Sequence, residues 1–100
     1  MRTLNEMLGM GLAVVVGEVR SAKPDSFSYI NKKTGLKVEV KLVRLGLEVG
    51  DQAEQCEARV DVEVVPDWAK KGKQYYFGCD EVLRENRRMS VRIKEVAEME

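Results

Sequence analysis

Alternation of apolar and polar residues with a period of two is the feature that most constrains how this 100-residue chain folds. In the segment 36–45, Leu36, Val38, Val40 and Leu42 lie on one side and Lys37, Glu39 and Lys41 on the other, and the segment 57–65 likewise has an apolar side and a charged side. Successive side chains of an extended strand point to opposite faces, so these segments fit half-buried β-strands and not helices. The residues predicted to face inward in the second segment are Ala58, Val60, Val62 and Val64.

Shorter segments of the same kind predict further strands at residues 12–20, 27–30, 74–77 and 89–96. Between them, Lys23-Pro24-Asp25 and the polar segment 83–88 are predicted to be turns, and residues 31–35 a hairpin loop that ends in glycine. Gly17 inside the first strand predicts a bulge or a sharp bend. Five or six short strands predict an all-β fold, best matched by a small five-stranded Greek-key barrel of the OB-fold type, with an SH3-like barrel as the nearest alternative.

The length of the chain is that of one domain. We expect an N-terminal lead-in of residues 1–11, a barrel domain of residues 12–96 and an acidic tail of residues 97–100. Thr3 and Glu6 have the spacing of a helix capping box, but Gly9 and Gly11 would end such a helix almost at once. No apolar run approaches the ~20 residues of a membrane span, and no signal-peptide cleavage pattern follows the first one, so we predict a cytoplasmic protein without membrane contact.

Residue types that carry catalysis are scarce in this chain. It has no histidine, which removes the commonest general base and the commonest metal ligand. Cys56 and Cys79 have no evident base partner; we expect two reduced thiols, although their spacing alone would allow a disulfide. We therefore predict a binding protein and not an enzyme, with no metal, no cofactor and no small-molecule substrate.

Charge is segregated along the chain although 17 basic and 17 acidic residues cancel in total. Residues 20–44 hold seven basic residues against two acidic ones, and residues 70–94 hold eight against three. Residues 51–67, between them, hold six acidic residues against one basic residue. If folding joins the two basic segments and turns the acidic strand away, one face attracts anions; the alternative is that these charges only keep strand faces solvated.

Five of the six aromatic residues lie in or beside the basic segments: Phe27, Tyr29, Tyr75, Tyr76 and Phe77. Proteins that bind single strands stack bases on such rings and neutralise phosphates with lysine and arginine. Tyr29, beside the polar hairpin loop, is the ring we expect to be exposed, whereas Phe77 and one tyrosine also suit a core, and Trp68 suits a barrel cap. The candidate nucleic-acid contacts are Arg20, Lys23, Tyr29, Lys32, Lys33, Lys37, Lys41, Lys73, Tyr75, Phe77, Arg87 and Arg88.

Three segments, in this order along the chain, resemble the filamentous-phage single-stranded-DNA-binding proteins, a single-OB-fold family. They are the strand-hairpin-strand from Arg20 to Lys41, the segment Lys71-Gly72-Lys73-Gln74-Tyr75-Tyr76-Phe77, and the final strand Met89-Ser90-Val91-Arg92-Ile93. The resemblance implies a homodimer that coats single-stranded DNA, or else RNA, without sequence preference in phage- or plasmid-type replication. The contacts that it implies are Arg20, Tyr29, Lys41, Phe77, Arg87 and Arg88.

Two features depart from the pattern of that family, namely the acidic strand and the zero net charge. Both leave room for a second hypothesis. The same barrel would serve as a protein-interaction or assembly module, forming a homo-oligomer through its strand edges without any role in nucleic-acid binding.

Overall fold

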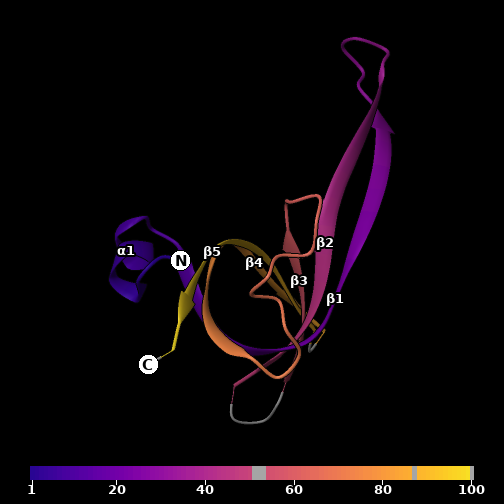
Figure 1. The fold of residues 1–100 in the computed structure, drawn as a ribbon. Coiled ribbons are helices and arrows are strands. Elements are labelled where there is room, and N and C mark those ends of the chain that lie inside the picture. The colour runs from indigo at the N-terminus through magenta and orange to yellow at the C-terminus, as the bar shows by residue number, and fades with distance from the viewer. Residues whose placement is uncertain (51–53, 87, 100) are drawn as a thin grey trace.

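A computed structural model describes residues 1–50, 54–86 and 88–99. In chain order the elements are α1 (Leu4–Gly9), β1 (Ala13–Ile30), β2 (Lys37–Val49), β3 (Glu54–Val60), β4 (Gln74–Glu85) and β5 (Arg88–Glu98). The strands close into a barrel in the order β1-β2-β3-β5-β4, and only the β3–β5 pair is parallel (Figure 1). The predicted fold class, an all-β five-stranded barrel of the OB type, is confirmed.

Alternate residues of all five strands fill the interior of the barrel. The buried cluster includes Val19, Leu45, Leu47, Ala58, Phe77, Val91 and Ile93. Trp68, on the β3–β4 connection, packs against this cluster, with its ring 5.9 Å from the ring of Tyr75 and 6.0 Å from that of Phe77. The β3–β4 connection thus supplies a large apolar side chain that covers the core from outside the strands.

The first two strands extend beyond the barrel as a long two-stranded arm (Figure 1). β1 pairs with β4 only as far as Glu18, and β2 pairs with β3 only from Val43 onward, so residues 25–30 and 37–42 pair only with each other. We call residues 25–42 the arm. It accounts for the elongated shape of the molecule, whose principal extents are 47 × 28 × 27 Å.

The prediction of a turn at Lys23-Pro24-Asp25 is wrong, because β1 continues through Pro24. The Asn31 N–H donates to the Leu36 carbonyl at 2.9 Å, which marks these two residues as a hydrogen-bonded pair of the ladder. Hydrogen-bonded and non-hydrogen-bonded pairs alternate in an antiparallel ladder, so Pro24 and Val43 form a non-hydrogen-bonded pair. The missing N–H of Pro24 therefore costs no ladder bond, and a proline is tolerated inside the strand.

A bulge in β1 changes which residues face outward. The register with β2 shifts between Val19 and Ser21, so Arg20 is an extra residue and the alternation changes phase there. Before the bulge Val19 faces the core, and after it Ala22 does. Odd-numbered residues from Lys23 to Tyr29 consequently face away from the core side, together with the even-numbered residues of β2 opposite them.

Strand ends differ from the prediction in two places. β3 ends at Val60, so Val62 and Val64, which we expected to face inward, are exposed. β4 continues to Glu85, so the turn predicted over residues 83–88 is confined to the point around Asn86, which has a φ of 48°.

The two chain ends also differ from the sequence assignment. The Thr3 hydroxyl accepts a hydrogen bond from the Glu6 N–H, and the resulting helix α1 ends at Gly9. Met7 of α1 is buried over Gly78, where an added Cβ would lie 2.8 Å from the Met7 sulfur. At the other end, β5 includes residues 97 and 98, which belong to the predicted acidic tail. Within the described ranges no helix is long and apolar enough to cross a membrane.

Candidate nucleic-acid interface

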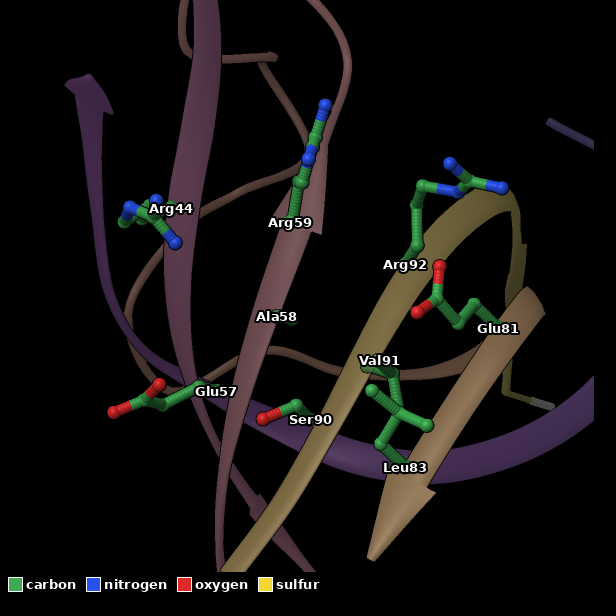
Figure 2. Close-up of a pocket in the computed structure, with 9 residues that line it drawn as sticks. All are labelled: Arg44, Glu57, Ala58, Arg59, Glu81, Leu83, Ser90, Val91 and Arg92. Atoms are coloured by element: carbon green, nitrogen blue, oxygen red, sulfur yellow. The ribbon is translucent and has the colours of Figure 1, made fainter. Parts of the chain in front are cut away.

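Three arginines lie side by side across the outer face of the barrel. The strand register places Arg44 of β2 opposite Arg59 of β3, and Arg59 opposite Arg92 of β5. Figure 2 shows the three side chains rising from neighbouring strands around a hollow of about 160 Å³. Like charges directly opposite each other destabilise a sheet. Carboxylate partners beside the row offset this repulsion.

Each arginine of the row is paired with an aspartate. Arg44 pairs with Asp25, the Arg59 Nε lies 2.6 Å from Asp61, and Arg92 makes two bonds of 2.8 and 2.9 Å to Asp80. The hydrogen bond from Arg44 lowers the pKa of Asp25, and that from Arg92 lowers the pKa of Asp80. These pairs are open to solvent, where ion pairs contribute little to stability, so a phosphate group can compete for the guanidinium groups.

A second hollow, of about 520 Å³, continues along the same outer face. It is lined by Arg20 and Arg88, two of the predicted contacts, and it shares Glu57 with the first hollow. Arg20 is itself paired with Glu18 at 2.8 Å and with Glu48 at 3.4 Å. We call the two hollows together the groove; it crosses β2, β3 and β5 and carries five arginines among several carboxylates.

Two aromatic rings stand next to the groove on the arm. Phe27 and Tyr29 are 40% and 49% exposed, and their rings stack at a centroid distance of 6.5 Å and an angle of 30°. They lie on the arm face that leads to Arg44, because residues 23, 25, 27 and 29 of β1 share that face after the bulge. The guanidinium of Arg59 lies 5.4 Å from the centre of the Phe27 ring, within cation–π range, so the aromatic pair and the arginine row form one surface.

The predicted lysines in and beside the arm are exposed but do not gather on one face. Lys23 lies opposite Arg44, beside the groove, and Lys32 and Lys33 are at the tip. Lys37 and Lys41 lie opposite Ile30 and Ser26, on the face away from Tyr29. Lys73 lies at the base of the arm, where its carbonyl accepts the Val19 N–H at 2.9 Å, on the β4 side of β1 and away from the groove.

Two of the predicted aromatic contacts are wrong. Phe77 is fully buried and Tyr75 is 6% exposed, both in the core, where a small barrel needs large side chains. The Tyr75 hydroxyl donates to the Trp68 carbonyl at 2.8 Å, and burial raises the Tyr75 pKa. Neither ring can stack on a base without unfolding the barrel. Arg87 lies outside the described residues.

The expected separation of acidic and basic surfaces is also wrong. Glu57 of the acidic strand lines both hollows of the groove, beside the arginines. Lys70 and Lys71 of the second basic segment lie on the loop before β4 and do not join the arm. The two basic segments meet only through arginines of the groove, Arg20 and Arg44 from the first and Arg88 and Arg92 from the second, and these lie among carboxylates.

Phe27, Arg44, Arg59 and Arg92 are not among the contacts predicted from the sequence. Arg59 and Arg92 occupy polar positions of alternating strands, so a signal for them was present, whereas Arg44 has the parity of the apolar residues of its strand and alternation did not point to it. What the sequence did not contain was the register that sets the three arginines in one row.

No three histidine, cysteine, aspartate or glutamate side chains among residues 1–50, 54–86 and 88–99 are grouped to hold a metal ion. Cys56 and Cys79 are both free and buried, and burial raises their pKa values to about 11 and about 12.

Comparison with models of protein families, with curated proteins and with solved structures finds no match for this chain.

Proposed function

We propose that this protein binds single-stranded nucleic acid along the groove and the arm. The single observation that carries the proposal is the exposed, stacked pair of Phe27 and Tyr29 beside the row of Arg44, Arg59 and Arg92. Stacking surfaces next to cations are the combination by which proteins hold single strands. A duplex hides the faces of its bases, so this arrangement favours single strands.

The proposed role of each side chain in binding the strand follows from its chemistry. Bases stack on Phe27 and Tyr29, while the planar guanidinium groups of Arg44 and Arg59 hold phosphate oxygens in place of their aspartate partners. Lysines of the arm add a diffuse positive field, since residues 20–44 hold seven basic residues against two acidic ones. Stacking and phosphate contacts do not distinguish the bases, so binding is tolerant of sequence.

The resemblance to the filamentous-phage single-stranded-DNA-binding proteins supports the same proposal. It adds a cytoplasmic setting, a part in coating strands during replication, and a non-catalytic role. The sheet topology is compatible with it, because the outer face of the second and third strands is where OB-folds bind oligonucleotides. DNA is the strand type that the resemblance favours, and RNA is the alternative that the test below separates.

The experiment is a titration of the protein into a fluorescent oligo-dT, followed by anisotropy at several salt concentrations. We expect binding that weakens linearly in log K against log salt, because phosphate contacts release counterions. Oligo-U of the same length separates RNA from DNA, and a duplex of the same length is the control that should bind more weakly. An unchanged anisotropy at low salt refutes the proposal.

An assembly module without a nucleic-acid role is the second candidate. One observation favours it: among the residues that the structure describes, no other strand pairs with the outer edge of β2 along the arm, from Lys37 to Leu42. This candidate predicts a stable oligomer whose size does not change when oligo-dT is added.

A further inference from the structure

The two edges of the arm differ in their capacity to accept another strand. On β1 the outward main-chain position at Pro24 has no N–H, which interrupts pairing along that edge. On β2 no proline or bulge interrupts residues 37–42, and β3 does not begin to pair until Val43. No hydrogen bond from a described loop or turn ends on this part of β2.

The hydrogen-bonding groups of the β2 edge can be assigned from the ladder. Leu36 bonds toward Asn31, so the even-numbered residues of β2 point their main-chain groups at β1. Lys37, Glu39 and Lys41 therefore point their N–H and C=O groups toward the open edge. These are donors and acceptors that an added strand would satisfy.

The side chains of this edge complement themselves when the strand is turned around. In an antiparallel pair of two copies with Val38 opposite Val38, each Lys37 lies opposite the Glu39 of the other copy. On the other face of the arm, each Val40 then lies opposite Leu36, whose side chain is 67% exposed in the single chain. Opposite charges and apolar pairs directly across two strands stabilise a sheet.

We propose that two copies of this chain associate through the β2 edges of their arms, with a twofold axis at Val38. Lys37 of each copy exchanges main-chain hydrogen bonds with Glu39 of the other, and the two arms form one four-stranded sheet. The surface is the edge of residues 36–41, and the partner is a second copy. The inference rests on strand register and does not depend on nucleic-acid binding.

Of the registers centred on Val38, Glu39 and Val40, only the first satisfies both charge and space. Centring the axis on Glu39 would set glutamate against glutamate and Lys37 against Lys41. Centring it on Val40 would pair Glu39 with Lys41 but would set Lys37 of one copy against Val43 of the other, a place that Val60 of β3 already occupies. Centred on Val38, the arm brings Gly35 opposite Lys41, two positions before Val43, the first residue of β2 that pairs with β3.

The association also bears on the aromatic surface. Val38 and Val40 lie on the same arm face as Phe27 and Tyr29, because these residues are opposite each other in the ladder. Joining the β2 edges therefore brings the two aromatic pairs onto one face of the combined sheet.

Sedimentation velocity over a range of protein concentrations tests the association. We expect a dimer for the wild-type protein, and a monomer for Glu39→Pro, which removes an N–H on the open edge and no bond to β1. Glu39→Lys should also give a monomer by setting lysine against lysine, and adding Lys37→Glu to it should restore the dimer. Lys41→Glu is the matched control on the same face, expected to remain dimeric because it meets only Gly35.

A covalent test checks the axis itself. Under mild oxidation Val38→Cys should form a disulfide-linked dimer, because non-hydrogen-bonded pairs bring Cα atoms to ~4.5 Å, within disulfide range. Val40→Cys is the control and should not cross-link, since the two copies of Val40 are well separated in this register. The native thiols are buried and do not interfere.

A wild-type protein that stays monomeric at all concentrations overturns the proposal. So does a dimer that Glu39→Pro and Glu39→Lys leave intact, because it would use another surface. Cross-linking of Val40→Cys in place of Val38→Cys overturns the register. Since none of these readouts uses an oligonucleotide, failure here is separate from failure of the nucleic-acid proposal.

Discussion

Replacing Tyr29 by alanine removes half of the proposed stacking surface with little effect on the fold. The ring is 49% exposed and lies on the arm, outside the buried cluster of the barrel. Its one aromatic neighbour is Phe27. Surface substitutions of this kind change the free energy of unfolding by about 0.5 kcal/mol or less, so any larger effect on binding comes from the lost contact with a base.

The size of the effect follows from stacking energies. A base stacked on an aromatic side chain contributes ~1–3 kcal/mol, which corresponds to a loss of affinity of roughly 5- to 150-fold for Tyr29→Ala. Tyr29→Phe keeps the ring and should bind within a few-fold of the wild type. Ile30→Ala removes a similar apolar side chain from the opposite face of the arm and is the matched control.

The assay is anisotropy of a fluorescent oligo-dT at one fixed, low salt concentration, with thermal unfolding of each variant measured alongside. The reasoning fails if Tyr29→Ala binds as tightly as the wild type. It also fails if Ile30→Ala weakens binding as much as Tyr29→Ala does, because the loss would then reflect a disturbed arm and not a missing ring.

Three further predictions concern the groove, the core and the thiols. Arg44→Ala should make the negative slope of log K against log salt shallower by about 0.7, which corresponds to the loss of one phosphate contact on a single strand. The control is Arg2→Ala, which should leave the slope unchanged because Arg2 pairs with Glu6 on the N-terminal segment. Phe77→Ala should cost about 3–5 kcal/mol of the free energy of unfolding, because the ring is fully buried, and denaturant unfolding measures it; a loss below about 1 kcal/mol contradicts the assigned core. Burial raises the pKa of Cys56 to about 11 and that of Cys79 to about 12, so the native thiols should resist iodoacetamide at neutral pH. In the unfolded chain these thiols have a pKa near 9.0, so above pH 9.0 the unfolded state binds fewer protons than the folded state. The urea midpoint of unfolding should therefore fall as the pH rises from 9.0 toward 11, and a midpoint that rises contradicts the burial of the thiols.

The aromatic and charged residues illustrate how far residue patterns reach toward the site. Tyr29 was predicted to be exposed because it lies beside a polar hairpin loop, and it is exposed. Tyr75 and Phe77 carry the same pattern of ring and neighbouring lysine, yet they fill the core. An aromatic ring beside lysines in the sequence can be exposed or can be buried in the core. Which of the two occurs depends on whether the face of the strand that carries the ring points outward or into the barrel.

Local alternation by itself determined that the chain forms strands and that its length and turns suit a five-stranded barrel, because a period of two is a property of each strand alone. The tertiary structure decided the rest. The bulge at Arg20 sets the phase that carries Phe27 and Tyr29 to the outer face of the arm. Strand register aligns Arg44 and Arg59 of two consecutive strands with Arg92 of the last strand. Which residues become neighbours across strands depends on how the strands slide past one another as the core fills, and that information belongs to no single segment of the chain.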